Sequence, residues 1–245
     1  MRRRLLAVAV IVLVAASLPT AAQPQPQRLT IYAASSLTDV FRAFDARQRY
    51  SFASSGTLET QIRNGAPADL YASASPVNTQ RLFRDGLVEK PVIFTANRLA
   101  LIVPRANPAG IHSVSDLRRK PVKLVVAGPA VPVGSYTRTV LKRMRLLSVL
   151  AKVVSQEADA RAVTGKVALG QAEAGFVYIT DARSVRDRVT VISIPAWAQP
   201  RVRYEIAVVS KSSRKAAARA WIEKILSTRG QATLKKHGFQ PLTGA

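Results

Sequence analysis

Two serine-rich segments, Ala33–Asp39 and Phe52–Thr57, hold the residues of this sequence that are best suited to bind a small polar ligand. Each segment follows a short run of residues typical of a strand, and each precedes apolar residues at helical spacing. A helix that begins at such a turn presents unpaired backbone N–H groups and the positive end of its dipole. With serine hydroxyls beside them, these groups form a site that favours an anion.

Ser36 and Ser55 are predicted to be the N-caps of the two helices, because serine is a preferred residue at that position. Asp39 follows Ser36 at the acidic position of a capping box. Most serines between a strand and a helix only cap, so capping without ligand binding is the alternative at both positions. If the two strands are parallel neighbours, both turns open at the carboxyl edge of one sheet, where α/β proteins bind ligands.

Three later positions could add hydrogen-bond donors. Gly128–Ser135 is a turn of small residues before a helix, but it lacks the Lys-Ser/Thr pair of a Walker A loop, so nucleotide hydrolysis is not predicted. Asp159 is the predicted N-cap of another helix. Tyr178 ends the predicted strand Gly175–Tyr178, where it is either a half-buried edge residue or a hydroxyl that donates into a cleft.

Strands and helices alternate along the chain, which predicts an α/β fold with mostly parallel sheets flanked by helices. Leu70–Ser73 is a predicted strand, with Ser75 and Pro76 as the N-cap and first residue of the next helix. The apolar run Arg98–Val103 predicts a strand buried on both faces, and the loop after it is a plausible change of lobe. The strand predicted at Arg203–Val209 could return the chain to the first lobe.

The amino terminus has the three regions of a secretory signal peptide. Arg2–Arg4 is charged, Leu5–Leu18 is apolar, and the small residues that follow predict cleavage near Ala22. An uncleaved membrane anchor is the alternative, although the apolar run is short for a membrane span. The sequence contains no cysteine, which excludes a lipoprotein anchor, disulfides, thiolate metal sites and cysteine nucleophiles.

The chain is strongly basic, with a formal net charge of +23 that falls to +20 when the arginines of the amino terminus are left out. Such a charge attracts anions and anionic surfaces. The basic residues are dispersed, no nucleic-acid-binding motif accompanies them, and aromatic residues are not interleaved with them. We therefore interpret the charge as a general property of the surface and not as a footprint for nucleic acid or a membrane.

Five motifs in this order resemble the periplasmic molybdate-binding proteins of ABC transporters. They are Ala33–Asp39, Ser51–Leu58, Gly65–Ser73, Val131–Gly134 and Gly175–Tyr178. The similarity extends from about Leu29 to the Gly238-Phe239 pair. Five ordered motifs are far more specific than either serine-rich segment alone.

The resemblance implies a two-lobed periplasmic binding protein fold, in which each lobe is a mostly parallel sheet flanked by helices and two crossover strands join the lobes. Lobe 1 would comprise residues 29–97 and 208–245 and lobe 2 residues 98–207, after a signal peptide (1–22) and a leader (23–28). The ligand-binding positions fall by motif on Ser36, Ser55, Val133, Ala160 and Tyr178. These residues would donate hydrogen bonds to the molybdate oxyanion and would not be direct ligands of its metal atom. Ala160 is smaller than the usual residue, but its backbone N–H is the expected donor.

The resemblance also implies the partners of the protein. Molybdate is the expected ligand, tungstate an equally acceptable one, and an inner-membrane ABC permease the expected partner of a periplasmic monomer that needs no cofactor and no nucleic acid. One alternative is another tetrahedral oxyanion, such as sulfate, in the same cleft. Another is a ligand-sensing domain of a transcription regulator, against which the export signal and the lack of a helix-turn-helix argue. An enzyme is not expected, because His112 and His237 are the only histidines, neither lies in a triad motif, and no G-x-S-x-G segment occurs.

Overall fold

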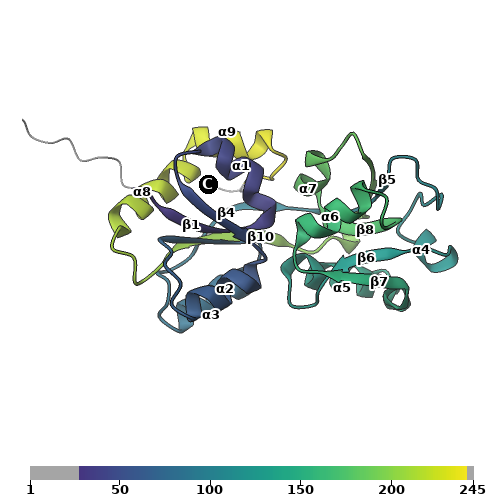
Figure 1. The fold of residues 1–245 in the computed structure, drawn as a ribbon, viewed down its shortest axis with the longest axis horizontal. Helices are drawn as coiled ribbons and strands as arrows, with labels where there is room; N and C mark the ends of the chain where they lie inside the picture. Colours follow the sequence, from purple (N-terminus) through teal and green to yellow (C-terminus); the bar gives the residue numbers. More distant parts are fainter. Residues whose placement is uncertain (1–27, 242–245) are drawn as a thin grey trace, which may run out of the picture.

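The computed structural model describes residues 28–241. The predicted signal peptide (1–22) lies outside the described residues, and so does the predicted leader (23–28) apart from Arg28. The described chain forms two lobes that lie side by side, each with a sheet between helices (Figure 1). Within this part of the chain, no helix combines the length and the apolar character needed to cross a membrane.

The first lobe is built on a five-stranded sheet with the order β2-β1-β3-β10-β4. β1 pairs in parallel with β2 and β3, whereas β10 runs antiparallel to β3 and β4. Helices α1, α8 and α9 cover one face and helices α2 and α3 cover the other (Figure 1). The elements are β1 (Thr30–Ala34), the 3₁₀ helix η1 (Ser35–Leu37), α1 (Thr38–Phe44), β2 (Arg49–Ala53), α2 (Ser55–Arg63), β3 (Leu70–Ser73), α3 (Pro76–Arg84), β4 (Val92–Asn97), β10 (Val202–Val208), α8 (Lys215–Leu226) and α9 (Thr228–Lys236).

The second lobe repeats this plan with the order β7-β6-β8-β5-β9. β6 pairs in parallel with β7 and β8, whereas β5 runs antiparallel to β8 and β9. Helices α6 and α7 lie on one face of the sheet and α5 on the other (Figure 1). The elements are β5 (Leu99–Pro104), α4 (Asp116–Arg119), β6 (Leu124–Ala127), α5 (Pro132–Arg143), η2 (Leu147–Lys152), β7 (Val153–Glu157), α6 (Ala160–Ala168), β8 (Ala174–Tyr178), α7 (Ile179–Ser184), β9 (Val189–Ser193) and η3 (Ala196–Ala198).

The chain passes between the two sheets twice, once from β4 to β5 through Arg98 and once from β9 through η3 to β10. In each sheet one strand, β10 or β5, opposes the direction of the other four, so the predicted α/β fold with two mostly parallel sheets is confirmed. β10 pairs in the first sheet from Val202 onward, where it lies opposite Asn97. The chain has therefore returned to the first sheet before position 208, the boundary expected from the motifs.

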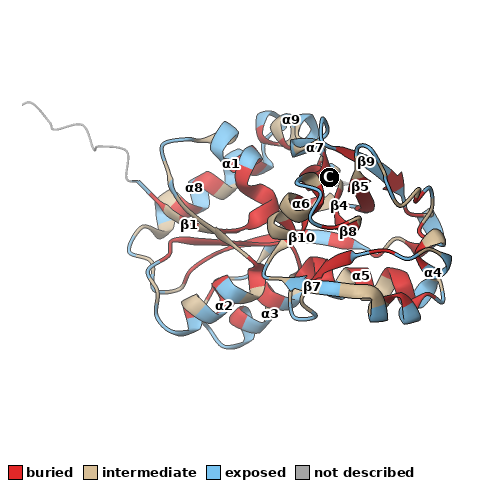
Figure 2. Cartoon of the chain, turned by 45° about the vertical axis from the view of Figure 1, so that its right-hand side comes forward, coloured by how far each residue is buried: buried red, intermediate tan, exposed pale blue. Residues whose placement is uncertain are grey.

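The strands at the centre of each sheet form the core, as the red strands inside both lobes show (Figure 2). β3, β6 and β8 are buried along their whole length, which fits strands covered by helices on both faces. A main apolar cluster extends through both lobes, and a smaller one lies beneath α2 and α3 around Leu58, Tyr71 and Leu82. The carboxyl ends of β1, β2 and β8, at Ala34, Ala53 and Tyr178, lie together at the boundary between the lobes.

Candidate functional site

A small hollow at the boundary between the lobes is lined by all five positions that the motifs indicate. Its wall comprises Ala34, Ser35, Ser36, Ala53, Ser54, Ser55, Ala74, Val131, Pro132, Val133, Asp159, Ala160 and Tyr178. Its volume is about 10 Å³, close to the smallest space that holds one water molecule. A guest of several atoms therefore enters only if the walls move apart.

Ser36 lies in the hollow but does not cap a helix, so this part of the prediction was wrong. The strand β1 runs directly into η1, which includes Ser36, and α1 begins only at Thr38 without a side-chain cap. The Ser36 hydroxyl instead forms a buried hydrogen bond with the hydroxyl of Tyr204, at 2.8 Å between the oxygens. Tyr204 lies on β10, and no local pattern in the sequence connects it with Ser36.

Ser55 also lies in the hollow, and its predicted capping role belongs to the preceding serine. Ser54 is the N-cap of α2, and its hydroxyl oxygen accepts from the N–H of Thr57 at 3.1 Å. The Ser55 hydroxyl oxygen accepts from the N–H of Ala74, just beyond β3, at 3.0 Å. Two adjacent serines therefore divide the roles that the sequence analysis gave to one.

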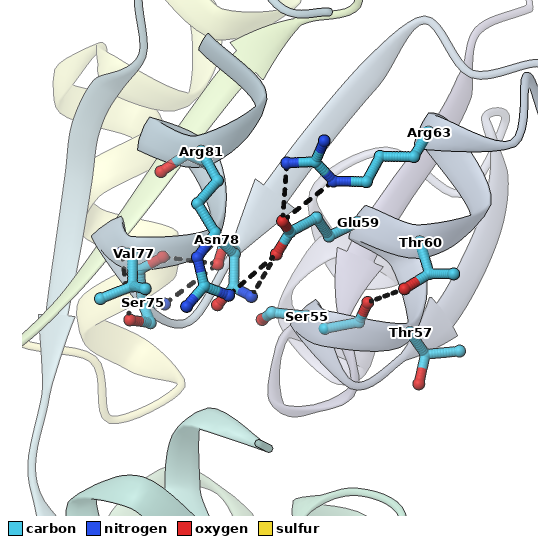
Figure 3. Close-up of polar contacts among 12 residues, drawn as sticks. Ser55, Thr57, Glu59, Thr60, Arg63, Ser75, Val77, Asn78 and Arg81 are labelled. Atoms are coloured by element: carbon cyan, nitrogen blue, oxygen red, sulfur yellow. Dashed lines mark hydrogen bonds and ion pairs between the residues drawn. The ribbon is translucent and has the colours of Figure 1, made fainter. Parts of the chain in front are cut away.

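A buried carboxylate fixes the position of α2 beside the hollow (Figure 3). The carboxylate of Glu59 accepts from the side-chain amide of Asn78 on α3 at 2.7 Å and from the Arg63 guanidinium at 3.2 Å. Arg81 lies 3.8 Å from the same carboxylate. These contacts join α2 to α3 within the first lobe.

Val133 and Ala160 lie at the first turns of α5 and α6, where the sequence analysis placed backbone donors. Pro132 begins α5, no side chain caps that helix, and the first N–H groups of a helix have no partner within it. Asp159 is the N-cap of α6, as predicted, and accepts from the N–H of Ala162 at 3.0 Å. The N–H group of Ala160 thus begins α6 beside the hollow.

Gly134 allows α5 to begin this close to β6. A Cβ atom at this position would overlap the backbone carbonyl oxygens of Ala127 and Gly128. Only a residue without a side chain fits here, and the close approach carries the adjacent Val133 to the wall of the hollow.

Tyr178 is the one tyrosine among the described residues that line the hollow. The residue is buried at the end of β8, and its hydroxyl has no hydrogen-bond partner within residues 28–241. Burial, with Tyr204 nearby, raises the pKa of Tyr178 well above its ordinary value, so the hydroxyl keeps its proton. It is therefore a donor that lacks an acceptor.

The chemistry of the wall is that of hydrogen-bond donation. The residues that line the hollow include no lysine or arginine, and its one carboxylate, Asp159, is engaged at the start of α6. The described chain also contains no cluster of histidine and carboxylate side chains suited to a metal ion. Neutral hydroxyl and N–H groups at several helix starts are the groups that hold an anion without a cationic side chain.

Charged residues of both lobes meet beside the hollow. Arg161 on α6 forms an ion pair with Asp39 on α1, which links the two lobes. Asp181 on α7 is buried, and one of its carboxylate oxygens has no hydrogen-bond partner in the described part of the chain. Burial raises the pKa of Asp181 from 3.8 to about 7, a shift opposed by Arg161 and assisted by Asp159 and Asp39.

The model of the bacterial extracellular solute-binding protein family matches residues 29–240. The chain belongs to this family. The sequence is 32% identical to the molybdate-binding protein ModA of Mycobacterium tuberculosis over 234 residues, which cover 91% of this chain and 88% of the relative.

Solved structures of other proteins share the fold of this solute-binding protein. The periplasmic molybdate-binding protein of Azotobacter vinelandii matches with a TM-score of 0.78 and 18% identity, over 88% of this chain and 100% of that protein. The sulfate-binding protein SubI of Mycobacterium tuberculosis matches with a TM-score of 0.77 and 19% identity, over 88% of this chain and 87% of that protein. These likenesses show the two-lobed fold, and the choice of solute must come from the site.

Proposed function

We propose that this solute-binding protein captures molybdate, with tungstate as an equally good guest, between its lobes and delivers it to an ABC permease. The observation that carries the proposal is the Tyr178 hydroxyl, which is buried at the hollow and lacks a partner within residues 28–241. A buried hydroxyl without a partner costs free energy, and a guest that brings an acceptor would remove this cost. The similarity to the ModA protein of Mycobacterium tuberculosis supports molybdate as that guest.

The proposed donors are the hydroxyls of Ser36, Ser55 and Tyr178 and the backbone N–H groups of Val133 and Ala160. A fully deprotonated dianion offers only acceptors, so it satisfies such a set completely. Phosphate keeps a proton near neutral pH and would need an acceptor in the wall. Sulfate is smaller than molybdate and could not contact every donor at once, which would leave some of them unpaired.

Closure of the lobes follows from the way these donors are divided. Ser36 and Ser55 come from the first lobe, and Val133, Ala160 and Tyr178 from the second. An anion that contacts both sets favours the closed arrangement, because an open one cannot complete the contacts. The closed form would be the one presented to the permease, with molybdate as cargo and no resident cofactor or catalytic step.

Isothermal titration with molybdate, tungstate, sulfate and phosphate tests the proposal. We expect tight binding of molybdate and tungstate and much weaker binding of sulfate and phosphate. Equal affinity for sulfate would favour the alternative of a sulfate-binding protein. The double variant Ser36→Ala/Ser55→Ala should lose most of the binding, whereas Ser51→Ala on β2, outside the wall of the hollow, should bind as the wild type does.

The route to the periplasm is a separate part of the proposal. We infer that the signal peptide is cleaved near Ala22 and that the mature protein acts in the periplasm as a monomer. The sequence of residues 1–22 supports this inference. Amino-terminal sequencing and light scattering of protein purified from the periplasm would test the cleavage site and the monomer.

A further inference from the structure

A chain of buried hydrogen bonds connects the Ser36 hydroxyl with residues at the two segments that cross between the lobes. Tyr204 on β10 contacts Ser36, with 2.8 Å between the two hydroxyl oxygens. The side-chain amide nitrogen of Asn97, at the end of β4, lies 3.3 Å from the Tyr204 hydroxyl and 2.9 Å from that of Thr180 on α7. The proposed function uses Ser36 but leaves the other three residues without a role.

The direction of each hydrogen bond in this chain can be assigned. The backbone N–H of Arg98 donates to the amide oxygen of Asn97 at 2.9 Å, so the amide nitrogen of Asn97 must face Tyr204 and Thr180. That nitrogen carries only donors, and the Tyr204 oxygen accepts from it. Of the two hydrogen bonds that Tyr204 forms, only the one to Ser36 then offers an acceptor for the Tyr204 proton.

The opposite direction would leave the buried proton of Tyr204 outside both of its hydrogen bonds. If Ser36 donated to Tyr204, the Tyr204 hydroxyl would accept in both of its hydrogen bonds, and its own proton would be used in neither. Burial also raises the pKa of Tyr204 well above its ordinary value, so this proton is not lost. An unmatched buried donor costs free energy, which favours donation from Tyr204 to Ser36.

We propose that Tyr204 and Asn97 are positioning residues that turn Ser36 into an obligate donor and thereby make the site select oxyanions that carry no proton. The proposal rests on the proposed function, since it concerns the same hollow. With its oxygen facing Tyr204, Ser36 points its own proton at the guest. A protonated anion such as phosphate would meet a donor where it needs an acceptor.

Ser55 shows the same arrangement by a different route. Its hydroxyl oxygen accepts from the N–H of Ala74 at 3.0 Å, so its proton is also free for a guest. The backbone N–H of Ala74 thus donates to the Ser55 oxygen, as the Tyr204 hydroxyl donates to the Ser36 oxygen. The N–H group of Ala74 belongs to the backbone, so only a substitution to proline would remove it. The Tyr204 hydroxyl belongs to a side chain, and the substitution Tyr204→Phe removes its oxygen alone.

The test compares Tyr204→Phe with the wild type for molybdate and for phosphate by isothermal titration. The variant keeps the aromatic ring, which packs edge-on against Phe94, Tyr178 and Phe239, so we expect it to fold. Molybdate affinity should fall about tenfold, because the hydrogen bond that orients the Ser36 hydroxyl is lost. Phosphate affinity should stay constant or rise, because the Ser36 oxygen becomes available as an acceptor. The ratio of the two affinities should therefore shrink by about tenfold or more.

Tyr50→Phe is the matched control for removing a tyrosine hydroxyl from the first lobe. The Tyr50 hydroxyl donates to the backbone oxygens of Phe41 and Asp45, away from the hollow. This variant should be somewhat less stable but should keep the wild-type ratio of affinities. An equal fall for both anions in Tyr204→Phe, or an unchanged ratio, would overturn the positioning role.

A measurement without ligand separates this proposal from the proposed function. If the wild type binds none of the oxyanions, the proposed function fails. The hydrogen bond from Tyr204 to Ser36 is then judged by a double-mutant cycle of Ser36→Ala and Tyr204→Phe, followed by urea unfolding of the ligand-free protein. Additive effects of the two substitutions would refute the hydrogen bond, and clearly non-additive effects would support it.

Discussion

At the scale of single residues, the boundary between the lobes contains three buried polar atoms that lack partners within residues 28–241. They are the hydroxyl of Tyr178, one carboxylate oxygen of Asp181 and the Nε atom of Arg161. Buried polar groups are nearly always paired, so each exception calls for an explanation. The proposed guest explains Tyr178, which lines the hollow. Asp181 does not line the hollow, and the protonation of its carboxyl group affects the stability of the folded protein.

Tyr178→Phe should lower anion affinity without lowering the stability of the ligand-free protein. The substitution removes a buried hydroxyl that has no partner in the described chain, so the free energy of unfolding should stay the same or rise. Molybdate affinity should fall about tenfold, because one donor is lost. Urea unfolding and titration of the same sample would check both statements.

Tyr71→Phe provides the contrast. The Tyr71 hydroxyl donates to the backbone oxygen of Ser55 at 2.7 Å, and its loss leaves that buried oxygen without this partner. We expect destabilisation of about 1–3 kcal/mol. If both tyrosine variants were destabilised alike, the Tyr178 hydroxyl would have to be paired in the ligand-free protein.

Asp181 should make the protein lose stability as the pH rises. Because burial raises its folded pKa from 3.8 to about 7, the folded protein binds a proton more tightly than the unfolded chain. Its contribution is fully present below about pH 4 and is lost between there and pH 7. Urea unfolding at several pH values should show a decline on the order of a few kcal/mol that is absent in Asp181→Asn. A parallel decline in the variant would assign the effect to other groups.

At the scale of the elements, local patterns predicted most of the framework. β3 has the predicted bounds, Ser75 and Asp159 cap the helices expected of them, and Pro76 begins α3. These assignments succeeded because a cap or a first-turn proline depends on residues a few positions apart. β4 was not predicted, since its place beside β10 depends on residues far along the chain.

The site was predicted less evenly than the framework. The motifs indicated which five residues line the hollow, but local rules assigned capping to Ser36 and Ser55, which do not cap. Choosing between Ser54 and Ser55 requires knowing which of them meets Ala74. Tyr204 could not be found from local sequence at all, because 168 positions separate it from Ser36.

Gly134→Ala should weaken anion binding by displacing the first turn of α5. The added methyl group would overlap the backbone of Ala127 and Gly128, and overpacking of this kind costs about 1–3 kcal/mol. The shift should carry the Val133 N–H away from the guest. Titration and thermal unfolding should both show losses.

Gly165→Ala on α6 is the control for Gly134→Ala. A Cβ atom at Gly165 meets no other atom within 4 Å, and alanine is the better helix former by up to about 1 kcal/mol. This variant should be as stable as the wild type or more so, with unchanged binding. Unchanged binding in Gly134→Ala as well would mean that the start of α5 does not contribute to the site.

At the scale of the whole molecule, contacts outside the wall of the hollow join the two lobes. Arg161 pairs with Asp39 across the boundary, and Gly56 of the first lobe lies close to the backbone oxygen of Ala130 in the second. The arginine and aspartate side chains are 38% and 50% exposed, so solvent weakens their attraction. We therefore expect the pair to affect the rate of opening more than the closure of the lobes.

Asp39→Asn should therefore release a bound anion faster by at most about fivefold. Trp197 on η3, in the second passage between the lobes, is exposed and provides a fluorescence signal for stopped-flow measurements. Asp187→Asn, which removes an ion pair within the second lobe, should leave the rate unchanged. A slower release of the anion in Asp39→Asn would show that this ion pair does not help to hold the lobes together.

The strand order of the two sheets determines how much of the chain must be available before each sheet can be completed. The second sheet takes its strands, β5 to β9, from one uninterrupted stretch, whereas the first keeps a place between β3 and β4 for β10. A chain that has entered the periplasm as far as Ser193 can complete the second sheet but leaves a gap in the first, with unpaired strand edges on both sides. The lobe that begins first along the chain is thus the last to be completed, so a chaperone that recognises open strand edges would find its target in the amino-terminal half.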